Sequence, residues 1–188
     1  MRNETLDAIA KRYSCRDFKS DTLSSEIIQA IADAAIQAPS AMNRQPWRVV
    51  VVTDKTLLQD LESEGMSFLQ SLEDKSTYDR IMERGGTLFY NAPCMIVIPV
   101  EKAQYESALI DCGIMCQNIT LAAQSLGVAS VICGLTRTAF ASGTRSEEFC
   151  TRLGFPEGFT FACSVLLGFA NTAKEPHTPD KDKIIFVR

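Results

Sequence analysis

The order of apolar and polar residues along the chain predicts helices interspersed with short buried strands. Apolar residues spaced three and four positions apart are typical of one helix face, and continuous β-branched runs are typical of buried strands. Helices are expected after Asn3, between Ser24 and Pro39, over residues 55–64, over residues 104–126, and between Thr144 and Gly154. Strands are expected over residues 47–52, 93–99, 128–133 and 159–169. Strands and helices that share one core predict a single α+β or α/β domain spanning residues 1–188.

Particular residues mark where these helices begin and end. Asn3 and Ser24 can accept hydrogen bonds from amides of a first helical turn. Gly127 suits the left-handed position that closes the helix over residues 104–126. Thr144 followed by Glu147 has the spacing of a capping box, so a short helix is expected to begin there.

Two segments follow neither pattern. Residues 65–91 mix glycine, charged and aromatic residues, and we interpret them as a mobile helical excursion over a site. Residues 170–188 contain Pro176 and Pro179 and end in Ile184-Ile185-Phe186-Val187. That ending has the composition of a strand, yet no partner for it is evident in its own chain.

Composition narrows the class of protein. The chain has 188 residues, 46% of them hydrophobic and 22% charged, which excludes a disordered protein. Lys and Arg number 19 against 23 Asp and Glu, so the net charge is −4. A mildly acidic chain has no general attraction for nucleic acid or for anionic membranes, and neither is expected as a partner. Any bound anion must therefore be held by a local group of basic side chains.

The histidine and cysteine content excludes further kinds of catalytic and metal-binding site. His177 is the single histidine and lies in the proline-containing tail, so a site with several His ligands or a Ser-His-Asp triad is not expected. The seven cysteines are an odd number, and Cys94, Cys133 and Cys163 lie within apolar runs. Reduced, buried cysteines are typical of cytosolic proteins, and no apolar run has the length of a signal or membrane segment. We expect a soluble, cytoplasmic protein.

Several familiar motifs are absent or weak. The chain contains no Gly-rich dinucleotide or P-loop fingerprint and no Cys-x-x-Cys pair. Cys112 and Cys116 share one face of a predicted helix, where they could form a metal or redox pair. We interpret them instead as small core residues, because an iron–sulfur site needs about four thiolates.

A basic segment follows the first helix. In Arg12-Tyr13-Ser14-Cys15-Arg16-Asp17-Phe18, an extended backbone would project Arg12, Ser14 and Arg16 to one side. Two guanidinium groups and a hydroxyl could hold a phosphorylated, polyhydroxylated ligand. Surface arginines paired with Asp17 or Glu4 would give the same pattern.

Two further segments have ligand-binding features. Ala38-Pro39-Ser40-Ala41-Met42-Asn43-Arg44-Gln45-Pro46-Trp47 carries amides that can pair with the N–H and C=O groups of a heterocycle. Gly134, after the predicted strand over residues 128–133, would allow a flat ligand to approach the backbone closely. An ordinary helix-to-strand loop and a plain turn remain the alternatives.

Taken in order, these segments resemble the short form of the nitroreductase family of FMN-dependent oxidoreductases. The resemblance rests on Arg-x-Ser-x-Arg-x-Phe followed by Ala-Pro-Ser-x-x-Asn-x-Gln-Pro-Trp, and it covers nearly the whole chain. Shorter matching segments are Phe89-Tyr90-Asn91-Ala92-Pro93, Asp111-Cys112-Gly113, Gln117-Asn118, Leu121-Ala122-Ala123 and Leu126-Gly127.

The resemblance implies an α+β fold with a central, mostly antiparallel sheet flanked by helices. It also implies an intertwined homodimer with two FMN sites at the interface. Residues 170–188 would reach across and add a strand to the partner's sheet. Residues 65–91 would be a variable helical excursion of the kind that often governs substrate choice in this family. NAD(P)H would be the electron donor, and FMN would be tightly but not covalently bound.

The same resemblance implies which residues contact FMN. Arg12 would meet the phosphate and Ser14 the ribityl chain, with Arg16 near the N1 and O2 edge of the ring. Pro39, Ser40 and Asn43 would line the ring from the other subunit, and Ile132, Cys133 and Gly134 would pass near N5. Lys181 and Lys183 would complete the phosphate site. The full set is Arg12, Tyr13, Ser14, Arg16, Pro39, Ser40, Asn43, Ile132, Cys133, Gly134, Lys181 and Lys183.

The chain departs from the family pattern at three places, one of which is the short and divergent stretch over residues 65–91. Many short members have Trp where this chain has Ile132 or Cys133. The stretch after Gly168 lacks the usual Gly-Tyr-Pro pattern, on which the placement of Lys181 and Lys183 depends.

The implied activity is hydride transfer from NAD(P)H through flavin N5 to a small electron-poor acceptor, a nitroaromatic or quinone, in ping-pong fashion. Arg16 would tune the flavin electrostatically, and no side chain need act as a catalytic base. The alternatives are ene reduction, dehalogenation or flavin fragmentation on the same scaffold, and a flavin carrier or sensor without turnover. A metal or thiol site built from the cysteines is the remaining alternative.

Overall fold

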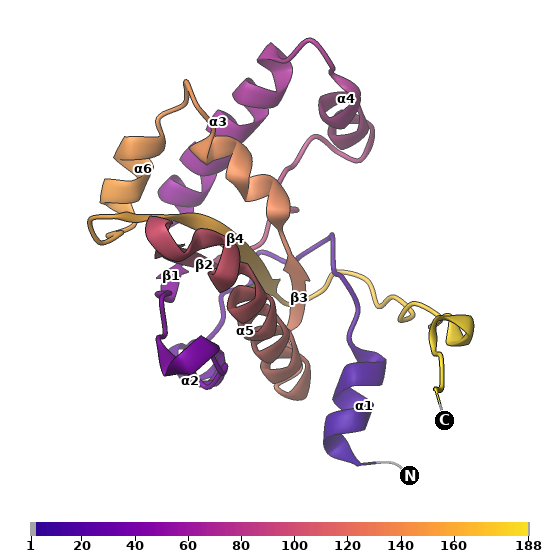
Figure 1. Cartoon of the computed structure of the whole chain (residues 1–188). Coiled ribbons are helices and arrows are strands. Elements are labelled where there is room, and N and C mark those ends of the chain that lie inside the picture. The colour runs from indigo at the N-terminus through magenta and orange to yellow at the C-terminus, as the bar shows by residue number, and fades with distance from the viewer. Residues whose placement is uncertain (1–2, 188) are drawn as a thin grey trace.

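One antiparallel sheet organises the computed structural model, which describes residues 3–187 (Figure 1). Its strands are β1 (Val50–Val52), β2 (Cys94–Glu101), β3 (Ala129–Ile132) and β4 (Phe159–Gly168), in the order β1-β2-β4-β3. Every adjacent pair is antiparallel. The expected α+β fold with a central antiparallel sheet is therefore confirmed.

Pro99 interrupts the ladder between the central and edge strands. β2 continues through Pro99 to Glu101, two residues beyond the expected end, and its register against β4 shifts between Ile98 and Pro99. Since proline has no N–H to donate, only one ladder bond remains opposite it, from Arg48 N–H to the Pro99 carbonyl at 3.0 Å. The strand expected over residues 47–52 is thus reduced to Val50–Val52, with Trp47 paired separately to Val100. Val51 is exposed, so β1 is an edge strand and not the fully buried strand expected.

Six α-helices surround this sheet in the described residues. They are α1 (Glu4–Lys11), α2 (Ser25–Ile36), α3 (Lys55–Ser71), α4 (Ser76–Glu83), α5 (Tyr105–Ser125) and α6 (Ser146–Arg152). Short 3-10 turns are η1 (Ala41–Asn43), η2 (Lys102–Gln104), η3 (Gly134–Phe140) and η4 (Lys181–Lys183). The side chains of Asn3 and Ser24 cap α1 and α2 as expected, and Gly127 after α5 has φ +72°.

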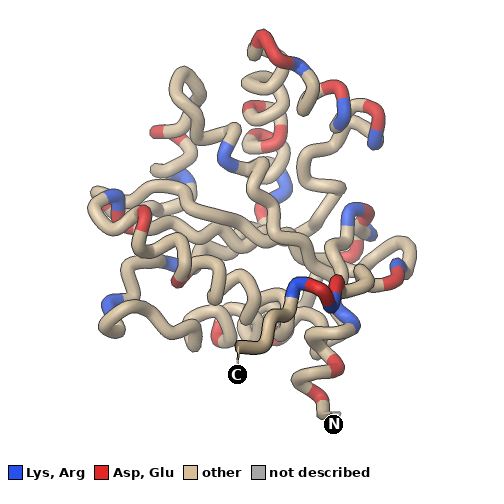
Figure 2. The backbone as a smooth tube through the Cα atoms, turned by 45° about the vertical axis from the view of Figure 1, so that its right-hand side comes forward, with Lys and Arg blue, Asp and Glu red and all other residues tan. Residues whose placement is uncertain are grey.

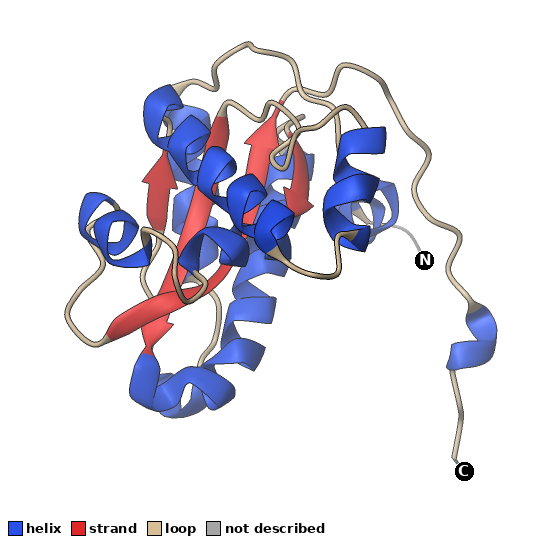
Figure 3. Ribbon diagram, turned by 90° about the horizontal axis from the view of Figure 1, so that it is seen from above, coloured by secondary structure: helices blue, strands red, loops and turns tan. Residues whose placement is uncertain are grey.

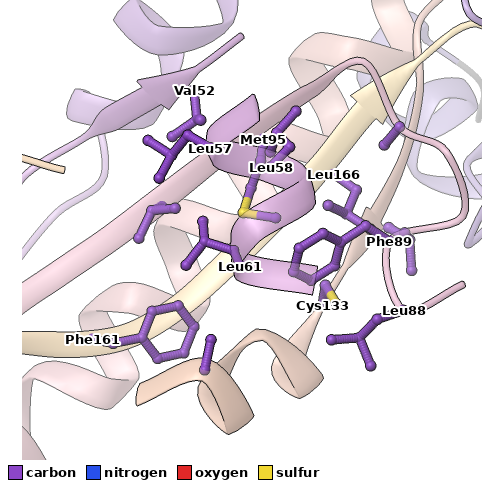
Figure 4. Close-up of a cluster of buried hydrophobic side chains, with 14 of the residues drawn as sticks. Val52, Leu57, Leu58, Leu61, Leu88, Phe89, Met95, Cys133, Phe161 and Leu166 are labelled. Atoms are coloured by element: carbon purple, nitrogen blue, oxygen red, sulfur yellow. The ribbon is translucent and has the colours of Figure 1, made fainter. Parts of the chain in front are cut away.

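The helices cover both faces of the sheet (Figure 3). On one face, α2 and α5 pack Ile31, Met115 and Ile119 against apolar residues of β2 and β4. On the other face, α3 and α6 pack Leu61 and Phe149 against the sheet. Figure 4 shows the α3 side of this second cluster, whose labelled members are Val52, Leu57, Leu58, Leu61, Leu88, Phe89, Met95, Cys133, Phe161 and Leu166.

α3 is longer than the sequence indicates. The expected helix over residues 55–64 continues to Ser71 through Gly65, which usually disfavours a helix interior. Gly65 is tolerated because α3 lies directly against η3: a Cβ there would stand 2.5 Å from Thr138 Oγ1. The remainder of residues 65–91 contains α4, which follows α3 at the far end of the molecule (Figure 1).

The expected capping box before α6 is wrong. Arg145, not Thr144, is the N-cap residue, and no side chain caps this helix. The Thr144 hydroxyl donates instead to the carbonyls of Ala139 and Ala141, at 2.9 and 2.7 Å. Arg145 N–H donates to Glu64 on α3, at 3.1 Å. Local turn bonds of Thr144 and one contact from α3 are therefore found in place of the expected cap.

The C-terminal tail leaves the body of the molecule (Figure 3). Ile184, Ile185, Phe186 and Val187 are 62–94% exposed and form no strand within this chain. Basic and acidic residues are interspersed along the backbone (Figure 2). Within residues 3–187, no helix combines the length and apolarity needed to cross a bilayer.

Candidate functional site

The segment after α1 runs extended along the edge of β3. Ser14 forms a parallel bridge with Ser130, and Cys15 N–H donates to the Ser130 carbonyl at 3.0 Å. Cys15 is buried, whereas Ser14 is half-buried and Arg16 is exposed. Side chains alternate along extended backbone, so Ser14 and Arg16 project away from the core, as the sequence predicted.

The two arginines of this segment are free to bind a ligand. Within residues 3–187, the guanidinium groups of Arg12 and Arg16 have no hydrogen-bond or ion-pair partner. The carboxylate of Asp17 accepts instead from the Asn171 amide, at 2.7 Å. The alternative of arginines paired with Asp17 or Glu4 is therefore wrong. Unpaired guanidinium groups on a sheet edge suit the phosphate of a ligand.

Tyr13, between these arginines in the chain, contacts the C-terminal tail. Its hydroxyl donates to the Thr172 carbonyl in the tail, at 3.4 Å. Partial burial raises the pKa of this phenol, and so does the neighbouring Cys15. Tyr13 therefore helps to fix the start of the tail beside the extended segment.

The end of β3 offers an open backbone next to this segment. Ile132 is 45% exposed, Cys133 is buried and Gly134 is exposed. A Cβ at Gly134 would meet only the Arg137 guanidinium, at 3.8 Å, so the outer side is accessible to a flat ligand. Because Ser14 pairs with Ser130, Arg12–Arg16 and Ile132–Gly134 share one edge of the sheet.

Hydrogen bonds hold this strand end in place. Cys133 N–H donates to the Ser164 carbonyl at 2.8 Å, and the Ser164 hydroxyl donates back to the Cys133 carbonyl at 3.0 Å. Thr136 and Ser164 share a further hydroxyl contact at 2.8 Å. Burial raises the pKa of the Cys133 thiol, so this side chain is neutral at pH 7. The strand end is thus rigid and uncharged.

The amide-bearing loop after α2 has an unusual backbone. Met42, Asn43 and Gln45 have φ values of +55°, +54° and +48°. Gln45 closes the loop on itself: its N–H donates to Ser40 Oγ at 2.9 Å, and its side-chain amide donates to Asn43 Oδ1 at 2.8 Å. These bonds hold the loop in one conformation. Within it, Pro39 and Asn43 are exposed and Ser40 is half-buried.

One protomer does not bring all the predicted residues together. α1, which leads into Arg12, lies to the right of α5 in Figure 1, and α2, which leads into Pro39, lies to its left. Lys181 and Lys183 are exposed on η4 in the outlying tail, where Lys183 Nζ is 3.9 Å from Asp180 Oδ2. The predicted residues therefore form three groups: the sheet edge, the loop and the tail.

The sequence alone did not indicate two long-range contacts near these groups. Ala41 N–H donates to Asp111 Oδ2 on α5 at 3.3 Å, and Cys116 Sγ lies 3.6 Å from Cys163 Sγ. Asp111 belongs to one of the matching segments, but its contact with the loop spans 70 residues. No local pattern encodes such a contact.

Comparison with known proteins identifies the family. The model of the nitroreductase family matches residues 9–169. The chain belongs to the nitroreductase family. A nitroreductase structure with bound FMN from Desulfitobacterium hafniense is 65% identical, covers all of both chains and superposes with a TM-score of 0.98. One from Bacteroides fragilis, also with bound FMN, is 26% identical over all of both chains, with a TM-score of 0.89.

An archaeal protein is also similar in sequence to this nitroreductase-family chain. An Archaeoglobus fulgidus protein, named by inference as an NADH dehydrogenase/NAD(P)H nitroreductase, is 31% identical over 181 residues. The match covers 94% of this chain and 91% of the archaeal protein. Family membership, first suggested by the ordered motifs, is confirmed.

Proposed function

We propose that this chain is an FMN-dependent NAD(P)H oxidoreductase that passes hydride from the nicotinamide to an electron-poor acceptor. The observation that carries the proposal is the sheet edge where unpaired Arg12 and Arg16 lie beside the open backbone of Gly134. This edge combines cationic groups for a phosphate with a flat, accessible surface for a ring. The FMN-bound relatives at 65% and 26% identity support the same ligand.

The chain's own residues bind and tune the cofactor. Bound FMN supplies hydride transfer at its N5 atom. Arg12 holds the phosphate by charge-assisted hydrogen bonds, and Ser14 binds the ribityl chain. Arg16 stabilises negative charge at the N1 and O2 edge of the ring, which favours two-electron transfer. Ile132, Cys133 and Gly134 line the ring near N5 and fix its orientation.

A second copy of the chain completes the site. Pro39, Ser40 and Asn43 reach the ring from the partner, which is why one protomer keeps them apart from Arg12. The exposed apolar residues Leu109, Ile110 and Ile114 of α5, with Leu6 and Ile9 of α1, suit the interface of a homodimer. The tail, residues 170–188, adds to the partner's sheet and carries Lys181 and Lys183 to the phosphate.

The donor and the acceptor use one pocket in turn. This pocket would admit NAD(P)H first and, after the nicotinamide product leaves, a nitroaromatic or quinone, which would give ping-pong kinetics. Residues 65–91, with α4, form the segment that governs acceptor choice. No titratable side chain of the chain is needed as a base in either half-reaction.

The visible spectrum of the purified protein tests cofactor and donor together. We expect a yellow preparation that bleaches when NADPH is added under nitrogen and recovers its colour with a quinone. A colourless monomer that does not bind FMN supplied in excess would contradict the proposal. Steady NAD(P)H oxidation in the presence of an acceptor distinguishes an enzyme from a flavin carrier or sensor.

A further inference from the structure

Cys112, Cys116 and Cys163 pack between α5 and the sheet, and Cys133, on the opposite face, interacts with Cys163. Cys112 and Cys116 lie one turn apart on α5, Cys133 follows β3, and Cys163 lies on β4. The Sγ atoms of Cys116 and Cys163 are 3.6 Å apart, and Cys163 interacts electrostatically with Cys112 and Cys133 as well. We name these four residues the cysteine cluster. Among residues 3–187, no group of three or more His, Cys, Asp or Glu side chains is arranged to hold a metal ion.

The two closest thiols differ in access to solvent. Cys116 is buried, as expected for a core residue on this helix, whereas Cys163 is half-buried. Cys163 is therefore the more exposed residue of the pair, and the Cys116 sulfur lies 3.6 Å from its sulfur. This order suits a reactive thiol backed by a second thiol that resolves the first product.

The surroundings of Cys163 favour its thiolate. The hydrogen bond from Cys116 Sγ is the main cause that lowers the pKa of Cys163 to about 7, and the Arg137 guanidinium acts in the same direction against the effect of burial. The pKa of Cys116 is raised by the same contact and by burial. The groups that interact with Cys163 are thus Cys112 and Cys116 from α5, Cys133 after β3 and Arg137 on η3. The contact therefore favours the thiolate at Cys163 and the protonated thiol at Cys116.

We propose that Cys163 and Cys116 form a hydroperoxide-reactive thiol pair that closes reversibly to a disulfide. In the first step, the Cys163 thiolate attacks one oxygen of hydrogen peroxide; an S–O bond forms, the O–O bond breaks and hydroxide leaves. In the second step, Cys116 Sγ attacks the sulfenic sulfur, forming the S–S bond. The S–O bond then breaks, and the hydroxyl group leaves with the Cys116 proton as water. The two sulfurs lose two electrons, and peroxide accepts them.

The geometry requires only a small movement. A disulfide bond is about 2.0 Å long, so the two sulfurs at 3.6 Å must approach by roughly 1.5 Å. The next residue along β4, Ser164, fixes the end of β3 through its bonds to Cys133 and Thr136. The disulfide therefore forms next to the strand end that lines the proposed flavin site, although the thiol chemistry does not depend on that site.

Disulfide mapping of the whole protein tests the proposal directly. Purified FMN-loaded protein is treated with hydrogen peroxide, free thiols are blocked by alkylation, and proteolytic peptides are analysed by mass spectrometry without reduction. We expect a linked peptide pair that joins Cys116 to Cys163, with the loss of two hydrogens, and its disappearance after treatment with a dithiol reductant. Oxidation confined to other cysteines, or a disulfide between other partners, would overturn the proposal.

Variants separate the roles of the two thiols. Cys116→Ser should leave a sulfenic acid on Cys163 that a dimedone probe labels, whereas Cys163→Ser should abolish both the label and the disulfide. Cys150→Ser is the matched control, because Cys150 is also half-buried but lies on α6, outside the cysteine cluster. It should leave the Cys116–Cys163 disulfide unchanged. Equal labelling of Cys163 with and without Cys116 would contradict the resolving role.

A rate comparison in the unmodified protein needs no variant. Burial raises the pKa of Cys150, whereas the pKa of Cys163 is lowered to about 7, so less of Cys150 than of Cys163 is thiolate at pH 7. Intrinsic nucleophilicity falls by about tenfold over two pKa units, so we expect iodoacetamide to modify Cys163 at least about five times faster than Cys150. The Cys163 rate should rise with pH to a plateau with a midpoint near its pKa of about 7. The proposal would be contradicted if iodoacetamide modified Cys163 more slowly than Cys150, or if the midpoint of the Cys163 rate lay above pH 9.

Discussion

The carboxylate of Asp111 on α5 accepts a hydrogen bond from the backbone N–H of Ala41, at 3.3 Å. Asp111 is 7% exposed, and the loop that it anchors contains three residues with positive φ. We expect Asp111→Ala to lower the free energy of unfolding by about 1–2 kcal/mol, because the loop loses the buried side chain that accepts its hydrogen bond. Since Ser40 and Asn43 would lose their fixed positions, FMN affinity should fall about tenfold. Urea denaturation and a flavin fluorescence titration measure the two effects.

Asp111→Asn provides the matched control, because an amide oxygen can still accept from Ala41. It should restore most of the lost stability and flavin affinity. Equal FMN affinity for the wild type and Asp111→Ala would show that this anchor does not position the loop.

Gly65 allows α3 to lie against η3. In Gly65→Ala, the new Cβ would stand 2.5 Å from Thr138 Oγ1 and 2.9 Å from Leu88 Cδ2. We expect a net destabilisation of about 1–3 kcal/mol despite the higher helix propensity of alanine, because the contact is overpacked. Ser67→Ala, on the exposed face of the same helix, should change stability by less than about 0.5 kcal/mol. A Gly65→Ala variant as stable as the wild type would mean that α3 moves away from η3 at little cost.

The apolar surface of α5 provides a test of the dimer. Ile110 is 73% exposed in the single chain. Ile110→Asp should convert a homodimer into monomers, because a charge at the centre of an apolar interface is left without water or a partner. Light scattering after size-exclusion chromatography gives the mass. Leu72→Asp, at the far end of α3, should leave the mass unchanged, and a wild-type monomer would rule out the proposed interface.

Arg16 provides a test of electrostatic tuning. In FMN-saturated protein, Arg16→Ala should lower the rate of flavin reduction by NADPH by about 10²- to 10³-fold, as expected when one preorganised electrostatic partner is removed. Arg16→Lys should retain part of the rate because it keeps the charge. The exposed cation Lys19 is a nearby control, and Lys19→Ala should reduce flavin at the wild-type rate. Stopped-flow absorbance measures the rate of flavin reduction in all four proteins. An unchanged rate in Arg16→Ala would show that Arg16 does not tune the flavin.

Acid should weaken the ion pairs that Glu148 forms with Arg145 and Arg152 at α6. The hydrogen bonds from Arg145 lower the pKa of Glu148 below its ordinary value of 4.5, and Arg152 adds to this effect. A lowered pKa in the folded state means that stabilisation is present above about pH 4.5 and is lost as the pH falls through the lower value. The drop in Tm between pH 7 and pH 3 should therefore be smaller in Glu148→Gln than in the wild type. Glu147→Gln should show the same fall in Tm as the wild type. An equal fall in Tm for Glu148→Gln would contradict the proposed role of Glu148 in acid sensitivity.

Most of the elements could be predicted from the sequence because their signals are local. Asn3, Ser24 and Gly127 lie at the helix ends as predicted, and the apolar runs around Ile96 and Val131 lie in strands. The errors arose where a distant residue decides the outcome. Pro99 shortens β1, and the contact of Gly65 with Thr138 favours a longer α3 than local propensity suggests.

The candidate site divides in the same way. Arg12, Ser14 and Arg16 could be placed on one side of an extended segment from alternation alone, and Gly134 at a strand end from its position in the pattern. The contact of Asp111 with Ala41 and the approach of Cys116 to Cys163 could not, because each joins residues more than 40 positions apart. The grouping of the loop with the sheet edge remains a prediction, since it depends on a second chain.

The exposed ending Ile184-Ile185-Phe186-Val187 has a consequence for the chain before assembly. It is an uncharged, β-prone segment that belongs to no strand of the described chain, which is the type of sequence that seeds amyloid-like stacking. A protomer that has not yet associated with a second copy therefore exposes an aggregation-prone segment. Prompt association with another copy, or shielding by a chaperone, would keep newly made chains from aggregating.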